Sequence, residues 1–175
     1  MSNLKQINNA DLRALLGNVC LSKATLAINA GSAATIKTTG TTTYIADGVH
    51  CTKSALSAAS FAVTHNYLGL PVATELPGAY VQPASTTVHY VVAYNAAGTV
   101  AVVQGNYSGQ VISSPPGTVV YGTGGLPLLP SGYTPIGIVK IVLGATTFTP
   151  GTTALDAASV TATYTDVCML PSTAP

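Results

Sequence analysis

The chain has 175 residues and a mass of 17.6 kDa, the size of a single domain. Charged residues make up only 6% of it and its net charge is +1, whereas a typical soluble domain is about 25% charged. This composition excludes the basic surface that a nucleic-acid partner requires, and the longest apolar stretch is too short to cross a membrane as a helix. Hydrophobic residues reach 47%, so we expect part of the surface to be buried against other chains.

The first 24 residues are expected to form an N-terminal arm with a short amphipathic helix. Asn9 can cap the helix, and Gly17 can end it. Leu12, Leu15 and Leu16 follow the i, i+3, i+4 spacing of one helical face, and Leu4 and Ile7 precede them. A helix of under three turns must dock this stripe on something, either its own domain or a neighbouring subunit.

Residues 25–175 are expected to form one β domain. Its first part, residues 25–54, reads as a meander with short strands at 25–30, 34–39, 42–46 and 49–52, the last two joined by Asp47-Gly48. Residues 55–84 form a connection that Pro71, Pro77 and Pro83 keep irregular.

The second β block covers residues 85–168, and residues 169–175 form a short tail. The alternating pattern of residues 88–94 predicts a strand. Residues 95–98 are expected to form a turn, and residues 99–104 the strand that returns after it. Residues 136–143 are apolar on both faces apart from Lys140, and residues 160–165 alternate with threonine, as in a half-buried antiparallel strand. The pattern predicts a mainly β fold, either an antiparallel β-sandwich or a small β-barrel, with the short N-terminal helix attached.

No group of residues in the sequence has the pattern of a catalytic, metal or cofactor site. The five carboxylates are scattered, and Asp11 and Asp47 are explained by the helix start and the hairpin turn. The three cysteines have no CxxC pair and are interpreted as buried thiols of the core. We therefore expect no enzyme, no metal and no cofactor.

Tyrosine is the most frequent aromatic residue, with nine copies and no tryptophan. Tyr90, Tyr94 and Tyr164 occupy positions on strands that face the core. Tyr107, Tyr121 and Tyr133 fall between predicted strands, in segments expected to be loops. These three, with the leucines and isoleucine of the arm, are the candidate interface residues.

Several stretches resemble a group of structural proteins from tailed-bacteriophage virions. They are AINAGSAATIKT (27–38), YIADGV (44–49), YVVAYNAAGTV (90–100), VQG (103–105), GYTPIGIVK (132–140), FTPGTTALD (148–156) and VTATYTD (160–166). Members of this group are capsid decoration (cement) proteins or head fibres.

The resemblance implies a homotrimer bound to the major capsid protein on the outside of the phage head. Such a protein would be made in the cytoplasm of the bacterial host, in agreement with free thiols and the lack of an apolar run behind Lys5. The function expected is therefore a decoration protein that cements neighbouring capsid subunits.

Two alternatives remain open at this stage. The loop tyrosines and the Gly- and Pro-rich segment at 113–135 would also suit a head or tail fibre that recognises the host, although the chain has no repeating shaft sequence. A small carbohydrate-binding module is the other alternative, and the lack of tryptophan and the few carboxylates argue against it.

Overall fold

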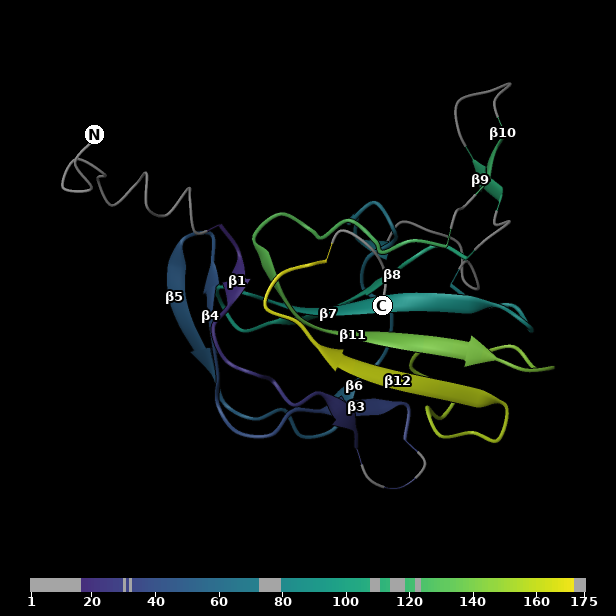
Figure 1. Cartoon of the computed structure of the whole chain (residues 1–175), viewed down its shortest axis with the longest axis horizontal. Helices are drawn as coiled ribbons and strands as arrows, with labels where there is room; N and C mark the ends of the chain where they lie inside the picture. Colours follow the sequence, from purple (N-terminus) through teal and green to yellow (C-terminus); the bar gives the residue numbers. More distant parts are fainter. Residues whose placement is uncertain are drawn as a thin grey trace.

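A computed structural model describes residues 17–29, 31, 33–72, 80–107, 111–113, 119–121 and 124–171 (Figure 1). In this part of the chain every sheet is antiparallel, and no residue belongs to an α-helix. The prediction of a mainly β fold with antiparallel pairing is thus confirmed. The expected helix of the N-terminal arm lies outside the described residues.

The largest sheet has four strands in the order β12-β11-β7-β8 and spans the middle of the molecule in Figure 1. Its strands are β7 (Thr87–Asn95), β8 (Val100–Gln104), β11 (Tyr133–Leu143) and β12 (Val160–Asp166). The alternating and doubly apolar segments of the sequence account for all four. The turn at residues 95–98 is also where it was predicted, since Gly98 N–H donates to Asn95 O at 2.9 Å.

Two three-stranded sheets accompany the large one. The first has the order β1-β4-β5 and consists of Val19–Cys20, Thr42–Ala46 and Val49–Lys53; the second has the order β2-β3-β6 and consists of Ala27–Ile28, Thr35–Lys37 and Ala59–Ser60. A separate pair joins β9 (Val111–Ser113) and β10 (Val119–Tyr121). Asp47 and Gly48 have φ values of 52° and 70°, the left-handed pair that a two-residue hairpin turn needs. The β fold begins at Val19, inside the segment expected to be an arm.

Both faces of the large sheet are covered by apolar side chains. On one face Tyr90, Val92 and Tyr94 of β7 enter the main core cluster, and on the other Val91 enters a second cluster with Val103 of β8. Adjacent residues on a strand point to opposite faces, so an unbroken apolar run is the natural sequence of this strand. The prediction that Tyr90 and Tyr94 face the core is confirmed because both are fully buried; Tyr164 is partly buried and packs against the same cluster.

Strand β11 is longer than the sequence indicated. It begins at Tyr133 rather than at residue 136, and its pairing with β7 shifts between Pro135 and Gly137, so Ile136 is the extra residue of a β-bulge. Proline is tolerated within a sheet at such a bulge. The expectation that Tyr133 lies in a loop is therefore wrong, and Tyr121 ends strand β10 instead of lying in a loop.

A buried glutamine fixes the connection before β7 to the large sheet. Gln82 is fully buried, and its Nε2 donates to Thr86 O at 3.0 Å and to Ile141 O at 3.1 Å. Its Oε1 accepts a hydrogen bond from the Tyr90 hydroxyl at 3.2 Å, and Gln104 Nε2 donates to that same hydroxyl oxygen at 3.3 Å. The main chain of Gln82 also exchanges two hydrogen bonds with Phe148. A polar side chain that is fully buried is stable only when its donors and acceptors are hydrogen-bonded, as those of Gln82 are.

Candidate interaction site

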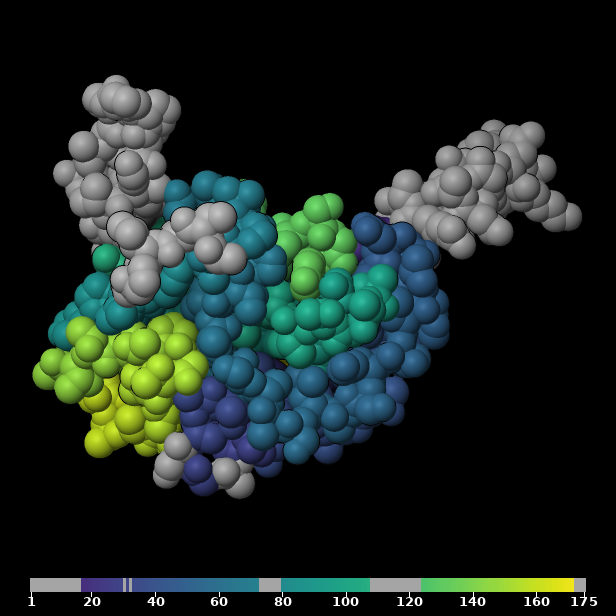
Figure 2. Space-filling model, turned by 180° about the vertical axis from the view of Figure 1, so that it is seen from behind, coloured from purple at the N-terminus to yellow at the C-terminus, as the bar shows by residue number. Residues whose placement is uncertain are grey.

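Two loops that meet at the surface place three leucines in solvent. Leu68 and Leu70 belong to the loop at residues 66–70, and Leu128 belongs to the segment at residues 126–130; we call these the leucine loops. Leu68, Leu70 and Leu128 are 47%, 55% and 62% exposed. Figure 2 shows the two segments side by side on one rim of the molecule.

Asn66 holds the first leucine loop in shape. Its buried side chain accepts hydrogen bonds at Oδ1 from the backbone N–H groups of Leu68 (3.0 Å) and Leu70 (3.1 Å). Its backbone accepts from Gly69 N–H at 2.8 Å and donates to Leu70 O at 2.9 Å. Four bonds within five residues make a compact, pre-formed loop, so little conformational entropy is lost when it binds a partner.

The second leucine loop is bonded to the first. Leu128 N–H donates to Tyr67 O at 2.9 Å. A Cβ on Gly69 would lie 2.9 Å from Leu129 O, so only glycine allows the two backbones to approach this closely. The leucines that flank Leu128, Leu126 and Leu129, pack on the second core cluster. Leu128 points outward because its neighbours already fill the space beneath the loop.

The leucine loops rest on the large sheet. Thr64 and His65, which directly precede the first leucine loop, pair with β8: Thr64 N–H donates to Val102 O at 2.9 Å, and Gln104 N–H donates to His65 O at 3.1 Å. Val72 N–H donates to Thr64 O at 3.0 Å and closes the first loop at its base. The loops themselves contain no charged residue. An apolar, rigid and uncharged projection of this kind is suited to burial against another protein.

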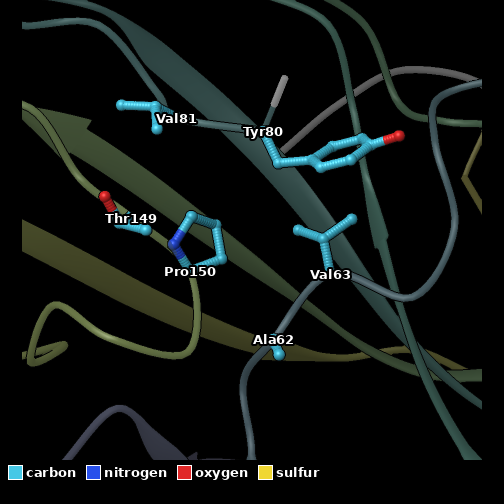
Figure 3. A pocket seen from close by; sticks show the side chains of 6 residues that line it. All are labelled: Ala62, Val63, Tyr80, Val81, Thr149 and Pro150. Carbon is cyan, nitrogen blue, oxygen red and sulfur yellow. The ribbon is translucent and has the colours of Figure 1, made fainter. Parts of the chain in front are cut away.

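A shallow pocket of about 180 Å³ lies close to the base of the first leucine loop in the chain (Figure 3). It is lined by Ala62, Val63, Tyr80, Val81, Thr149 and Pro150. The Tyr80 ring lies over Val63, and Pro150 faces them from the other side. The lining residues are mostly apolar, and their only side-chain polar groups are the hydroxyls of Thr149 and Tyr80, so the pocket suits one inserted apolar side chain better than a reacting group.

The structure brings only some of the predicted interface residues into view. Leu4, Ile7, Leu12, Leu15 and Leu16 lie outside the described residues, and only the backbone of Tyr121 is described. Tyr107 is partly buried and packs on the main core cluster. Tyr133 packs on the second cluster, with its ring 5.5 Å from the ring of His65.

Sequence reasoning missed the leucine loops. The signal was the placement of Leu68, Leu70 and Leu128 among glycines and prolines, in segments that cannot enter a sheet. Apolar residues held there must either pack back onto the domain, as Leu126 and Leu129 do, or remain in solvent.

Two observations concern the polar side chains of the described residues. No three His, Cys, Asp or Glu side chains among them come together to hold a metal ion. Thr64 Oγ1 lies 2.9 Å from His65 Nδ1, which resembles a nucleophile beside a base. The same hydroxyl oxygen, however, accepts from Val102 N–H at 3.0 Å and lies 3.2 Å from Val102 O, so it serves the pairing with β8. Burial lowers the pKa of His65, which favours the neutral ring.

The cysteines differ in their surroundings. Cys20 is buried, and burial raises the pKa of its thiol, so it is an inert core thiol as expected. Cys51 is partly exposed and Cys168 is exposed, so the prediction of a core position is wrong for Cys168 and only partly met by Cys51. All three are free thiols.

Comparison with known proteins gives no relative: no family model, no curated protein and no solved structure matches this chain. Within the described residues no helix is long and apolar enough to span a membrane.

Proposed function

We propose that this chain is a structural protein of a tailed-bacteriophage virion, a decoration protein that binds the outside of the head and cements neighbouring major capsid subunits. The proposal unites the sequence resemblance with the leucine loops. The low charge of the chain fits a surface that is covered in the assembled particle.

The observation on which the proposal depends most is the pre-formed apolar projection. The exposed surface of the three leucines, added together, corresponds to between one and two fully exposed leucine side chains. Burying a whole leucine side chain contributes about 1.5–3 kcal/mol, so the site can supply about 2–5 kcal/mol per subunit. This energy corresponds to a factor of about 30 to about 4,000 in affinity.

We further propose that the sheets pack as a β-sandwich, with the two three-stranded sheets against one face of the large sheet. In this arrangement the leucine loops lie at the edge next to β8, and the N-terminal segment at residues 2–17 is the candidate for a second contact with the capsid or with a neighbouring subunit. Two separated apolar contacts on one subunit would let it span a boundary between capsid subunits, which is how a cement protein stabilises a shell.

The test is binding of purified protein to capsids of the parent phage assembled without it. A variant with Leu68→Ser, Leu70→Ser and Leu128→Ser should retain its fold, because about half of each side chain is already in solvent and none belongs to a core cluster, and it should lose at least tenfold in affinity. Leu21→Ser is the matched control, since Leu21 is 52% exposed on another part of the surface.

Equal binding by the wild type and the triple variant would refute the role of the leucine loops. Loss of binding on deletion of residues 1–16 alone would move the main contact to the arm. Binding to glycans by the isolated protein, with none to capsids, would favour the carbohydrate-binding alternative.

A further inference from the structure

In the large sheet and the two three-stranded sheets, every edge strand but one is very short, carries charged side chains or is covered by another segment of the chain. β8 is covered by the Thr64–His65 segment, and β1 is covered where Cys20 N–H donates to Cys168 O at 2.8 Å. β2 and β6 have two residues each. β5 carries His50 and Lys53. Charged and very short edge strands are the usual protection against pairing with another chain.

Strand β12 is the exception. It has seven residues, Val160–Asp166, and lies at the border of the large sheet on the side opposite β8 (Figure 1). From Val160 to Thr165 it contains no charge and no proline, and it pairs with β11 without a bulge.

The backbone groups of β12 that face away from β11 can be assigned from the flanking hydrogen bonds. Gly144 N–H donates to Ser159 O at 3.0 Å, and Val167 N–H donates to Ile136 O at 3.3 Å. Antiparallel pairs alternate between bonded and non-bonded. Thr161, Thr163 and Thr165 are therefore bonded to β11, and Ala162 and Tyr164 direct their N–H and C=O groups outward.

No hydrogen bond occupies those outward groups in the described part of the chain. The contacts found near the strand ends are Val160 N–H to Ala157 O at 2.8 Å and Leu26 N–H to the Asp166 carboxylate at 3.0 Å. Ala162 and Tyr164 thus leave backbone donors and acceptors available between two anchored ends. Such a row is a template for one more strand.

We propose that β12 pairs antiparallel with β12 of a second copy of this chain, joining two large sheets into one. The register that pairs all seven residues places Ala162 opposite Tyr164 of the second copy, and Thr163 opposite Thr163. Each of the Ala162–Tyr164 pairs exchanges two hydrogen bonds, and the two-fold axis passes between the threonines.

The side chains agree with a second copy as the partner. The charged end of each strand, Asp166, faces Val160 of the other copy, so the two carboxylates lie at opposite ends of the interface. Thr161, Thr163 and Thr165 face threonines across the axis, and cross-strand threonine pairs are favourable. The uncharged stretch from Val160 to Thr165 does not select a charged partner, and it can pair with the same stretch of a second copy without repulsion between the two strands.

The outer face of the sheet beside this edge carries an apolar residue, Val142, and one charged residue, Lys140, which lies opposite Thr163 in the β11–β12 ladder. Val142 lies opposite Thr161 in the β11–β12 ladder and is 40% exposed. Pairing of two copies brings their Thr161 and Val142 side chains onto one continuous face. The interface therefore includes side-chain contacts in addition to the backbone bonds.

Sedimentation velocity of the full chain over a range of concentrations measures the association. We expect a dimer of twice the 17.6 kDa subunit mass. Thr163→Lys puts two like-charged side chains directly opposite each other at the axis, with their Cβ atoms about 5 Å apart, and should weaken association at least tenfold. Thr52→Lys on β5 is the matched control, because Thr52 is also an exposed threonine on an edge strand and should leave the dimer intact.

A second variant tests the backbone bonds. Ala162→Pro removes an N–H that faces outward, so it spares the ladder with β11 and should yield a folded monomer. Circular dichroism and thermal unfolding verify the fold of both variants. If Ala162→Pro does not fold, Thr163→Lys decides the outcome.

Cross-linking locates the axis directly. In the proposed register Thr163 forms a non-hydrogen-bonded pair with itself, with Cα atoms about 4.5 Å apart, which is within disulfide range. Thr163→Cys in a Cys168→Ser background should form a covalent dimer when oxidised with copper phenanthroline. Thr52→Cys in the same background should not.

A wild-type monomer, a trimer such as the resemblance implies, or a dimer that survives Thr163→Lys would each overturn the proposal. The proposal is independent of virion function. Dimerisation is measured on the purified chain and capsid binding on assembled capsids, so either proposal can be refuted without affecting the other.

Discussion

Replacing Gln82 with leucine tests the buried polar network of the fold. The side chain is similar in size, so the change removes hydrogen bonds without opening a large cavity. Thr86 O would still accept from Leu143 N–H at 3.0 Å, and Ile141 O would keep its bond in the β7–β11 ladder. The Tyr90 hydroxyl loses the acceptor of its proton and stays buried.

The magnitude follows from these remaining partners. An unsatisfied buried hydroxyl costs about 1–3 kcal/mol, and each carbonyl that loses one of its two bonds adds up to about 1 kcal/mol. We therefore expect Gln82→Leu to lower the free energy of unfolding by about 2–4 kcal/mol, and the Tm by about 5–15 °C.

Urea unfolding followed by circular dichroism measures this change, because the chain has no tryptophan to report it. Tyr90→Phe removes the unpaired hydroxyl, so the double variant should be less destabilised than the sum of the two single variants. Strict additivity, or a Gln82→Leu variant as stable as the wild type, would refute the interpretation of this network.

Two further predictions concern the tyrosines and the leucine loops. Burial raises the pKa values of Tyr94 and Tyr164 to about 12 from 10.0, so the stability that their neutral forms supply is present below pH 10 and is lost as the pH rises towards 12. Urea unfolding across this range should show a steep loss, by up to about 1.4 kcal/mol per pH unit for each tyrosine, and a flat profile would contradict it. Asn66→Ala should speed amide hydrogen exchange at Leu68 and Leu70 at least tenfold while exchange in β7 is unchanged, and it should weaken capsid binding; unchanged exchange at both leucines would show that another group holds the loop.

Local chemistry accounts for the parts of the fold that the sequence predicts well. Asp47-Gly48 between two β-forming runs specifies a tight hairpin within four residues, and the structure has it. The apolar run of β7 is equally local, since each residue faces one of two cores. These features need no knowledge of distant partners.

The missed features depend on contacts between distant segments. The sequence places a break at Pro135, but the bulge at Ile136 lets β11 continue past it to Tyr133. Gln82 reads as a loop residue because its partner Ile141 is 59 residues away. The leucine loops were missed for the same reason: the bond from Leu128 N–H to Tyr67 O joins two segments that each look like irregular connections.

The central claim, a shell component that decorates the phage head, is tested most directly by the copy number of this chain in purified virions. Quantitative mass spectrometry against the major capsid protein gives that number. The decoration function predicts copies on the scale of the capsid protein itself. A handful of copies per particle would contradict it and favour a fibre, and a particle that lacks the chain altogether would refute a virion function.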